Sequence, residues 1–269
     1  MVDYEEKTMD AVQNMYSHFS RVASRYRQVR TTDIEPIAFI GETLRGLPEV
    51  TAADVGCGDG RYNLLLFRHL NNLHLTCIDI NEYMLEEVLD YLTSHGITNF
   101  RTIKAHVDDI PLKDNSMDCI LTFNAIHHFD FVKFIEKSDK VIKENGTIFI
   151  YTRLRSQNVS SIWGQYFPLF SERETRLYEL YEMEQWIQSV DSLRLEIAKS
   201  FKYKRNTTIE QLVEKVKARH YSTFSLYEED ELDEVLKTFQ ENIRRLFQDT
   251  NKIEYFDENI LLVLKQKQS

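Results

Sequence analysis

Residues 52–63, with the sequence AADVGCGDGRYN, contain Gly56, Gly58 and Gly60 directly after an apolar run. Glycine adopts positive φ at little cost, and its backbone approaches a ligand closely because it has no side chain. A loop of this kind between a buried strand and a helix therefore predicts a ligand site. The alternative is a tight strand-to-helix turn that holds nothing.

The spacing of these glycines excludes two familiar phosphate loops. The dinucleotide fingerprint G-x-G-x-x-G needs a glycine where Arg61 stands, and no Gly-Lys-Ser/Thr follows to make a P-loop. Asp54 lies two positions before Gly56, where a carboxylate gives an anion-binding loop no advantage. A ligand with an ammonium and a sulfonium group would gain from that carboxylate.

A second carboxylate, Asp79, ends the next apolar run, LHLTCIDI at 73–80. At the end of a strand, a carboxylate accepts both ribose hydroxyls of a nucleoside and rejects a 2′-phosphate. It does not separate NAD from other adenosine ligands. Together with Asp54 and the glycines, Asp79 makes the interpretation of the loop as a simple turn much weaker.

Short apolar runs alternate with amphipathic segments through the first 155 residues, which predicts an α/β sheet that is mostly parallel and covered on both faces. We expect strands at 49–57, 73–80, 100–107, 117–124, 146–152, 195–204 and 258–267. We expect helices at 4–28, 33–45, 62–70, 82–96, 131–144, 208–222 and 229–248.

The composition bounds the class of protein. The chain has 269 residues, 42% of them hydrophobic, with a net charge of −10 and no run of the length that a membrane span needs. We expect no membrane association, no secretory signal, no nucleic-acid partner and a cytoplasmic location. Its three cysteines suggest neither disulfides nor a zinc site, and its scattered histidines predict no metal.

The motifs ADVGCGDGR, CIDIN, VDDIPLKDNSMDCILTFNAIHHF and VIKENGTIFIYT resemble the class I S-adenosylmethionine-dependent methyltransferases, in their ubiquinone/menaquinone- and trans-aconitate-type small-molecule branch. The resemblance covers residues 50–152 well. It implies a Rossmann-like seven-stranded sheet in the order 3-2-1-4-5-7-6, with strand 7 antiparallel, helices on both faces and a helical cap. It also implies one methyltransferase domain over 1–269. We divide this domain into a helical cover (1–45), a cofactor-binding core (46–155), cap insertions (156–192 and 206–255) and closing strands (193–205 and 256–269).

The resemblance assigns further cofactor contacts to S-adenosylmethionine. Ile80 and Met84 would pack on the adenine, and Asn124 would lie along the methionine moiety. The family often has Asp where His106 stands, so the contact to the adenine amino group stays open between His106, Val107 and Asp108.

Two histidines and an N-terminal segment complete the predicted site. His127 and His128 follow the fourth strand, where a ligand binds in open α/β sheets; either would act as a general base, or the pair would cap a turn or pack on the cofactor pocket. Tyr16, Tyr26 and Arg30 would fold over the cofactor, with an arginine on its carboxylate. The alternative for these three is an ordinary exposed helix.

The acceptor is predicted from residues 151–186, which are rich in aromatic residues and arginines. Arg153, Arg155, Trp163 and Tyr166 would bind a small, partly apolar, anionic acceptor. Alternatively, the aromatics form their own core and the arginines pair with nearby glutamates. We therefore expect methyl transfer to a small molecule by a monomer or homodimer. A nucleic-acid methyltransferase, a non-catalytic S-adenosylmethionine-binding protein and, more weakly, an NAD oxidoreductase are the rival hypotheses.

Overall fold

The structure, a computed structural model, describes residues 16–21, 23, 27 and 30–267. The chain divides into two compact units that interleave along the sequence. The sheet unit comprises Thr32–Ser156, Arg176–Lys202 and Glu258–Ser269. The helical unit comprises Met1–Thr31, Gln157–Thr175 and Tyr203–Asp257. Each unit is described by itself.

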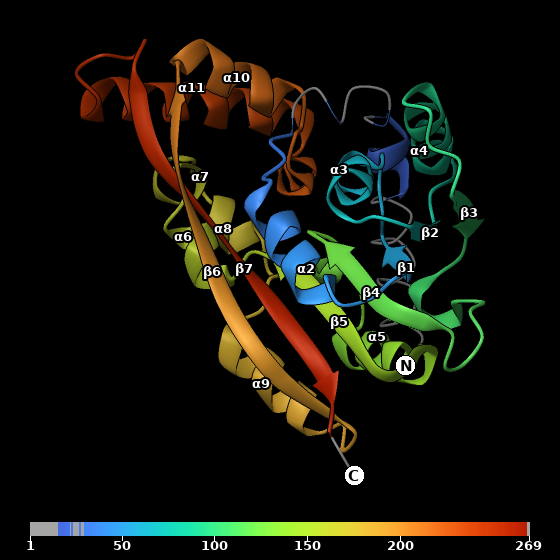
Figure 1. Cartoon of the computed structure of the whole chain (residues 1–269). Helices are drawn as coiled ribbons and strands as arrows, with labels where there is room; N and C mark the ends of the chain where they lie inside the picture. The colour runs from blue at the N-terminus through green and yellow to red at the C-terminus, as the bar shows by residue number, and fades with distance from the viewer. Residues whose placement is uncertain (1–15, 22, 24–26, 28–29, 268–269) are drawn as a thin grey trace, which may run out of the picture. The chain divides into compact units, whose positions relative to one another are not determined.

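The sheet unit is built on seven strands in the order β3-β2-β1-β4-β5-β7-β6 (Figure 1). The pairs from β3 to β5 are parallel, and β7 is antiparallel to β5. This confirms the predicted strand order and the antiparallel last strand. The strands are β1 (Val50–Val55), β2 (Leu73–Asp79), β3 (Phe100–Lys104), β4 (Met117–Phe123), β5 (Ile142–Thr152), β6 (Leu193–Thr207) and β7 (Ile253–Gln266).

Helices cover the sheet in two groups. The helical elements of the sheet unit are α2 (Glu35–Leu44), α3 (Arg61–His69), α4 (Glu82–Ser94), η1 (Val107–Asp109), η2 (Ile126–His128), α5 (Phe131–Val141) and α9 (Leu180–Gln188). α2, α3 and α4 contact one another in turn, and α4 also packs on β2 and β3, whereas α5 packs on β5 and α9. Right-handed crossovers place α3 and α4 on one face and α5 on the other, because the strand order reverses between β1 and β4.

One apolar core of this unit lies under α5 and α9. It joins apolar side chains of β4, β5 and β7 with those of the two helices, among them Phe134, Ile150, Met183 and Leu262. α5 ends at Val141, three residues before the predicted end at Glu144. The reason is that Ile142 is extended and fully buried opposite Met117, and Asn145 has a φ of 65°, so the chain enters β5 with an irregularity.

The helical unit has its own apolar core. Its elements are α7 (Ile162–Tyr166), α8 (Phe170–Arg173), α10 (Ile209–Lys217), η3 (Ser222–Leu226) and α11 (Glu229–Leu246); α6 (Arg155–Val159) begins in the sheet unit. Aromatic rings dominate this core: Trp163 stacks on Phe239 with ring centroids 5.4 Å apart, and Phe167 lies 5.1 Å from Phe224. Apolar side chains of α10 and α11, such as Leu212 and Ile243, complete it.

The predicted bounds of the N-terminal helix and of the closing strands can be compared with the described residues. Of the predicted N-terminal helix at 4–28, residues 16–21 are described and are helical. The closing strands have the bounds 193–207 and 253–266, close to the predicted 193–205 and 256–269. Within the described part of the chain, no helix is both long enough and apolar enough to cross a membrane.

Candidate functional site

The glycine loop follows β1 at the carboxyl edge of the sheet. Gly56, Gly58 and Gly60 have φ angles of 72°, 55° and 77°, in the left-handed region that favours glycine. A Cβ atom at Gly56 would lie 2.6 Å from the Cβ of Ala125, whereas one at Gly58 would meet nothing within 4 Å. Gly56 is therefore fixed by packing against its own unit, while Gly58 exposes backbone to open space.

Asp79 holds this loop from the neighbouring strand. One carboxylate oxygen accepts the backbone N–H of Gly58 at 2.9 Å, and the other accepts that of Asn81 at 2.9 Å. Burial raises the pKa of Asp79, and the backbone hydrogen bonds oppose that shift. Each carboxylate oxygen has two lone-pair sites, so Asp79 keeps acceptor capacity for a ligand hydroxyl after these backbone hydrogen bonds.

Asp54 is buried in β1 directly before the loop, with its side chain 1% exposed. One of its oxygens accepts the side-chain N–H of Asn63 at 2.6 Å, and the other, Oδ1, has no hydrogen-bond partner among the residues that the structure describes. Burial is the largest cause that raises the pKa of Asp54 from 3.8 to about 7; Asn63 and Arg61 lower it, and Asp79 adds to the rise. A buried acceptor without a partner calls for an explanation, and a bound ammonium group fits it.

The predicted adenine contacts lie past β2 and β3. Ile80 is 38% exposed beside Asp79, whereas Met84 is buried in α4. Val107 is buried in the core under α5. The adenine role of Ile80, Met84 and Val107 stays a prediction.

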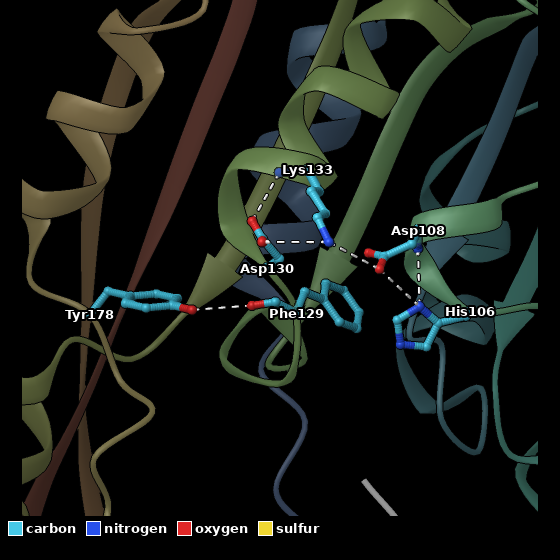
Figure 2. Close-up of polar contacts among 6 residues, drawn as sticks. All are labelled: His106, Asp108, Phe129, Asp130, Lys133 and Tyr178. Carbon is cyan, nitrogen blue, oxygen red and sulfur yellow. Dashed lines mark hydrogen bonds and ion pairs between the residues drawn. The ribbon is translucent and has the colours of Figure 1, made fainter. Parts of the chain in front are cut away.

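His106 and Asp108 form a small polar cluster with the start of α5. Figure 2 shows the imidazole of His106 accepting the backbone N–H of Asp108 at 3.2 Å, and Lys133 reaching the Asp108 carboxylate at 3.5 Å. Asp130 accepts the backbone N–H of Lys133 at 3.1 Å and so begins the helix. Asp108 thus already has a cationic neighbour, and the adenine contact stays open between His106, Val107 and Asp108.

The two predicted catalytic histidines lie in the short helix η2 after β4. The rings of His127 and His128 are half-buried and 4.0 Å apart, and the backbone N–H of His128 bonds the carbonyl of Ala125 at 2.8 Å. They therefore help to form a turn, and a role as general base stays a prediction. Nearby, the hydroxyl of Tyr178 donates to the carbonyl of Phe129 at 3.1 Å, as Figure 2 shows.

Asn124 directly follows β4 and has the left-handed conformation, with a φ of 54°. Its side-chain N–H lies 3.4 Å from the hydroxyl of Tyr62, whose ring stacks on Phe123 at 4.5 Å. Asn124 therefore stands at the edge of the sheet next to the glycine loop, and its place beside the methionine moiety stays a prediction.

A buried polar chain that joins the carboxyl end of β5 to the middle of β7 was not predicted from the sequence. Arg153 donates to the Asn259 side-chain oxygen at 3.2 Å, Asn259 donates to the Tyr151 hydroxyl at 3.0 Å, and that hydroxyl donates to Asp33 at 3.4 Å. All four side chains are less than 10% exposed. The sequence gives one faint signal, the polar Asn259 at the start of the apolar run ILLVL.

The other predicted acceptor residues make contacts within their own units. Arg155 pairs with Glu182 at 3.0 Å and donates to the carbonyl of Leu177 at 3.1 Å. Trp163 is 2% exposed in the core of the helical unit, and Tyr166 lies edge-on to Phe247 at 5.8 Å. These contacts agree with the alternative in which aromatics form their own core and arginines pair with glutamates. The contact of these residues with an acceptor stays a prediction.

The predicted cofactor lid lies in the helical unit. Arg30 donates to the carbonyl of His220 at 2.9 Å, and its guanidinium lies over the ring of Tyr221 at 4.5 Å. Tyr16 is half-buried, and its carbonyl accepts the hydroxyl of Ser20 at 2.8 Å. Tyr26 lies outside the described residues. A closing role for these three residues stays a prediction.

The chain is similar to known methyltransferases in sequence and in fold. Residues 53–150 match the family described as "Methyltransferase domain". An uncharacterized methyltransferase of Bacillus subtilis, YcgJ, is 26% identical over 49% of this chain and 52% of its own length. The matches with the first three curated relatives span 28%, 52% and 46% of the lengths of those relatives.

Solved structures share the fold. A methyltransferase from an antibiotic biosynthesis pathway of Anabaena variabilis has a TM-score of 0.65 at 20% identity, covering 88% of this chain and 99% of that one. An N-methyltransferase of Haemonchus contortus, in complex with phosphomonomethylethanolamine and S-adenosylhomocysteine, has a TM-score of 0.52 at 14% identity, covering 86% and 52%. At 20% and 14% identity, these structures show that the chain shares the fold of the two enzymes.

Proposed function

We propose that this protein transfers a methyl group from S-adenosylmethionine to a small-molecule acceptor. The observation that carries the proposal is Asp54, a buried carboxylate directly before the glycine loop. Among the described residues, one of its oxygens has no hydrogen-bond partner, and the backbone of Gly58 faces open space. A ligand that carries both a cation and a nucleoside would place the cation on Asp54 and the ribose hydroxyls on Asp79. The cofactor bound by the Haemonchus relative in its solved structure has the same two features.

Three residues of the sheet unit would each contact a different part of the cofactor. Asp54 would accept from the ligand's ammonium, the backbone at Gly58 would lie along its methionine portion, and Asp79 would accept the ribose hydroxyls. When bound, S-adenosylmethionine supplies the electrophilic methyl group and its own leaving group. The protein's contribution is then largely to position the two reactants.

The proposed acceptor is small and anionic. Arg153 supports the anionic part of the proposal, because it directly follows β5 at the carboxyl edge of the sheet and a guanidinium binds a carboxylate through paired N–H groups. His127 or His128 would take a proton where the attacking atom must lose one. The net charge of −10 speaks against a nucleic-acid acceptor. The three buried, unbridged cysteines support a reducing compartment such as the cytoplasm.

The test is a methyl-transfer screen. The purified chain is incubated with S-adenosylmethionine and a panel of carboxylic acids, phenols, amines and RNA, and methylated products are detected by mass spectrometry. We expect a carboxylate-bearing acceptor, with a raised KM in Arg153→Gln and an unchanged KM in the exposed control Arg68→Gln. Methylation of RNA alone would contradict the small-molecule assignment, and preference for a cationic acceptor would contradict the anionic one.

A further inference from the structure

The buried polar chain reaches the carboxyl edge of the sheet at Arg153, and all of its members belong to the sheet unit. The antiparallel register pairs Thr152 with Ile260, so the next residues along the two strands, Arg153 and Asn259, lie opposite each other. Residues 260–264, which follow on β7, are apolar and at most 3% exposed. Asn259 is thus a polar residue at the edge of an apolar run, next to the proposed acceptor side of the sheet.

Each hydrogen bond in the polar chain has one direction. Arginine can only donate, so Arg153 Nε–H donates to Asn259 Oδ1 at 3.2 Å, and this fixes which way the amide points. The amide nitrogen then donates to the Tyr151 hydroxyl at 3.0 Å, and that hydroxyl donates to the Asp33 carboxylate at 3.4 Å. The Asn259 amide therefore has a single orientation.

The tyrosine in the polar chain is held firmly. Its side chain is fully buried, and its ring centroid lies 6.0 Å from that of Tyr62, 6.4 Å from that of Phe123 and 6.2 Å from that of Phe201. The backbone carbonyl of Tyr151 accepts the N–H of Asn124 at 2.7 Å. Its hydroxyl is therefore a fixed point from which the amide of the polar chain is oriented.

Folding stability alone does not require a polar chain at this place. Apolar groups of the same shape can replace two hydrogen-bonded partners at little cost, whereas buried polar networks lock their members in one arrangement. A guanidinium is planar and its N–H groups form a rigid fork. One hydrogen bond at Nε of Arg153 therefore directs the edge that its two Nη groups form.

We propose that Asn259 is a positioning residue which, anchored by Tyr151 and Asp33, orients Arg153 so that its two Nη groups bind a carboxylate of the acceptor. The inference rests on the proposed function, in which Arg153 binds an anionic acceptor. It also narrows the class of acceptor. A carboxylate accepts two parallel N–H groups at once, whereas a primary amide would turn its own N–H donors toward the guanidinium. Asn259 thus sets the preference for a carboxylate over the corresponding amide.

The experiment is calorimetry on the purified protein saturated with S-adenosylhomocysteine. The probes are benzoate, phenylacetate and cinnamate, each compared with its primary amide. We expect the wild type to bind at least one carboxylate more tightly than its amide. In Asn259→Leu this preference should fall about ten-fold. Arg153→Gln should lose as much, and the double variant should lose no more, because Asn259 acts through Arg153.

Two further variants complete the design. Tyr151→Phe removes only the hydroxyl and should lower the preference about three-fold, so it tests the proposal even if Asn259→Leu does not fold. The control is Thr147→Val, which changes a buried polar residue on β5 opposite Lys265, at the other end of the paired strands. It should keep the preference of the wild type. A merely structural role of the polar chain would lower the stability of the variants and leave the preference unchanged.

Three results would overturn the inference. They are a wild type that binds no carboxylate more tightly than its amide, an unchanged preference in folded Asn259→Leu or Tyr151→Phe, and additive losses in the double variant. Each leaves methyl transfer itself standing, provided that S-adenosylhomocysteine binds. A wild-type protein that binds no S-adenosylhomocysteine would instead reject the proposed function, and the inference with it.

Discussion

A substitution at Gly56 should mainly lower the folding stability, whereas a substitution at Gly58 should mainly block ligand binding. Both residues have positive φ, so either alanine costs about 1–2 kcal/mol of folding stability through backbone strain. At Gly56 the new Cβ also lies 2.6 Å from Ala125 and 2.8 Å from the ring of Phe129. Such overpacking adds about 1–3 kcal/mol. Gly56→Ala should therefore lose about 2–5 kcal/mol and Gly58→Ala only the strain.

Among folded variants, ligand binding should be lost more by a substitution at Gly58 than by one at Gly56. A side chain at Gly58 enters the open space where we expect the ligand, so Gly58→Val should abolish binding of S-adenosylhomocysteine. The measurements are urea unfolding followed by circular dichroism and a calorimetric titration of each folded variant. Normal binding by folded Gly58→Val would refute the reasoning and leave the loop as a turn. Equal losses of stability in the two alanine variants would refute the packing argument at Gly56.

Three further predictions test single groups. Asp79→Ala should weaken S-adenosylhomocysteine binding by about 1.5–3 kcal/mol in calorimetry; an unchanged affinity in the folded variant would remove Asp79 from the site. Because the folded pKa of Asp54 is raised from 3.8 to about 7, the folded state binds more protons between these values and loses stability as the pH rises. Asp54→Asn should remove that loss and stabilise the ligand-free chain at pH 8 by up to about 4 kcal/mol in urea unfolding; equal stability at pH 8 would contradict the raised pKa. If either histidine is the base, His127→Ala or His128→Ala should lower kcat by about 10²–10⁴ with cofactor affinity nearly intact; loss of affinity instead would indicate a packing role.

The parts that were predicted from the sequence depend on local patterns. Short apolar runs bounded by polar residues were sufficient to predict β1, β2, β4 and β5. β6 is 15 residues long and mostly exposed, so its prediction depended more on its order along the chain than on an apolar run. The loop and Asp79 were also predictable, since both lie at strand ends, where Asp79 holds the N–H of Gly58.

The polar chain through Tyr151 could not be found in this way. Its hydroxyl reaches Asp33, 118 residues earlier, and Asn259, 108 residues later, and no periodicity links such distant positions. The interpretation of 156–192 as one cap missed a division for a similar reason. Residues 157–175 belong to the helical unit, whereas Trp186 packs on Phe131 of α5 in the sheet unit, with ring centroids 5.4 Å apart.

The central claim is that the edge formed by β1 and β2 binds S-adenosylmethionine. Calorimetric titration of the purified chain with S-adenosylmethionine, and separately with NAD, tests it most directly. We predict saturable binding of one S-adenosylmethionine per chain and no heat of binding with NAD. Saturable binding of NAD, or no binding of S-adenosylmethionine by a chain that unfolds cooperatively and is therefore folded, would contradict the claim.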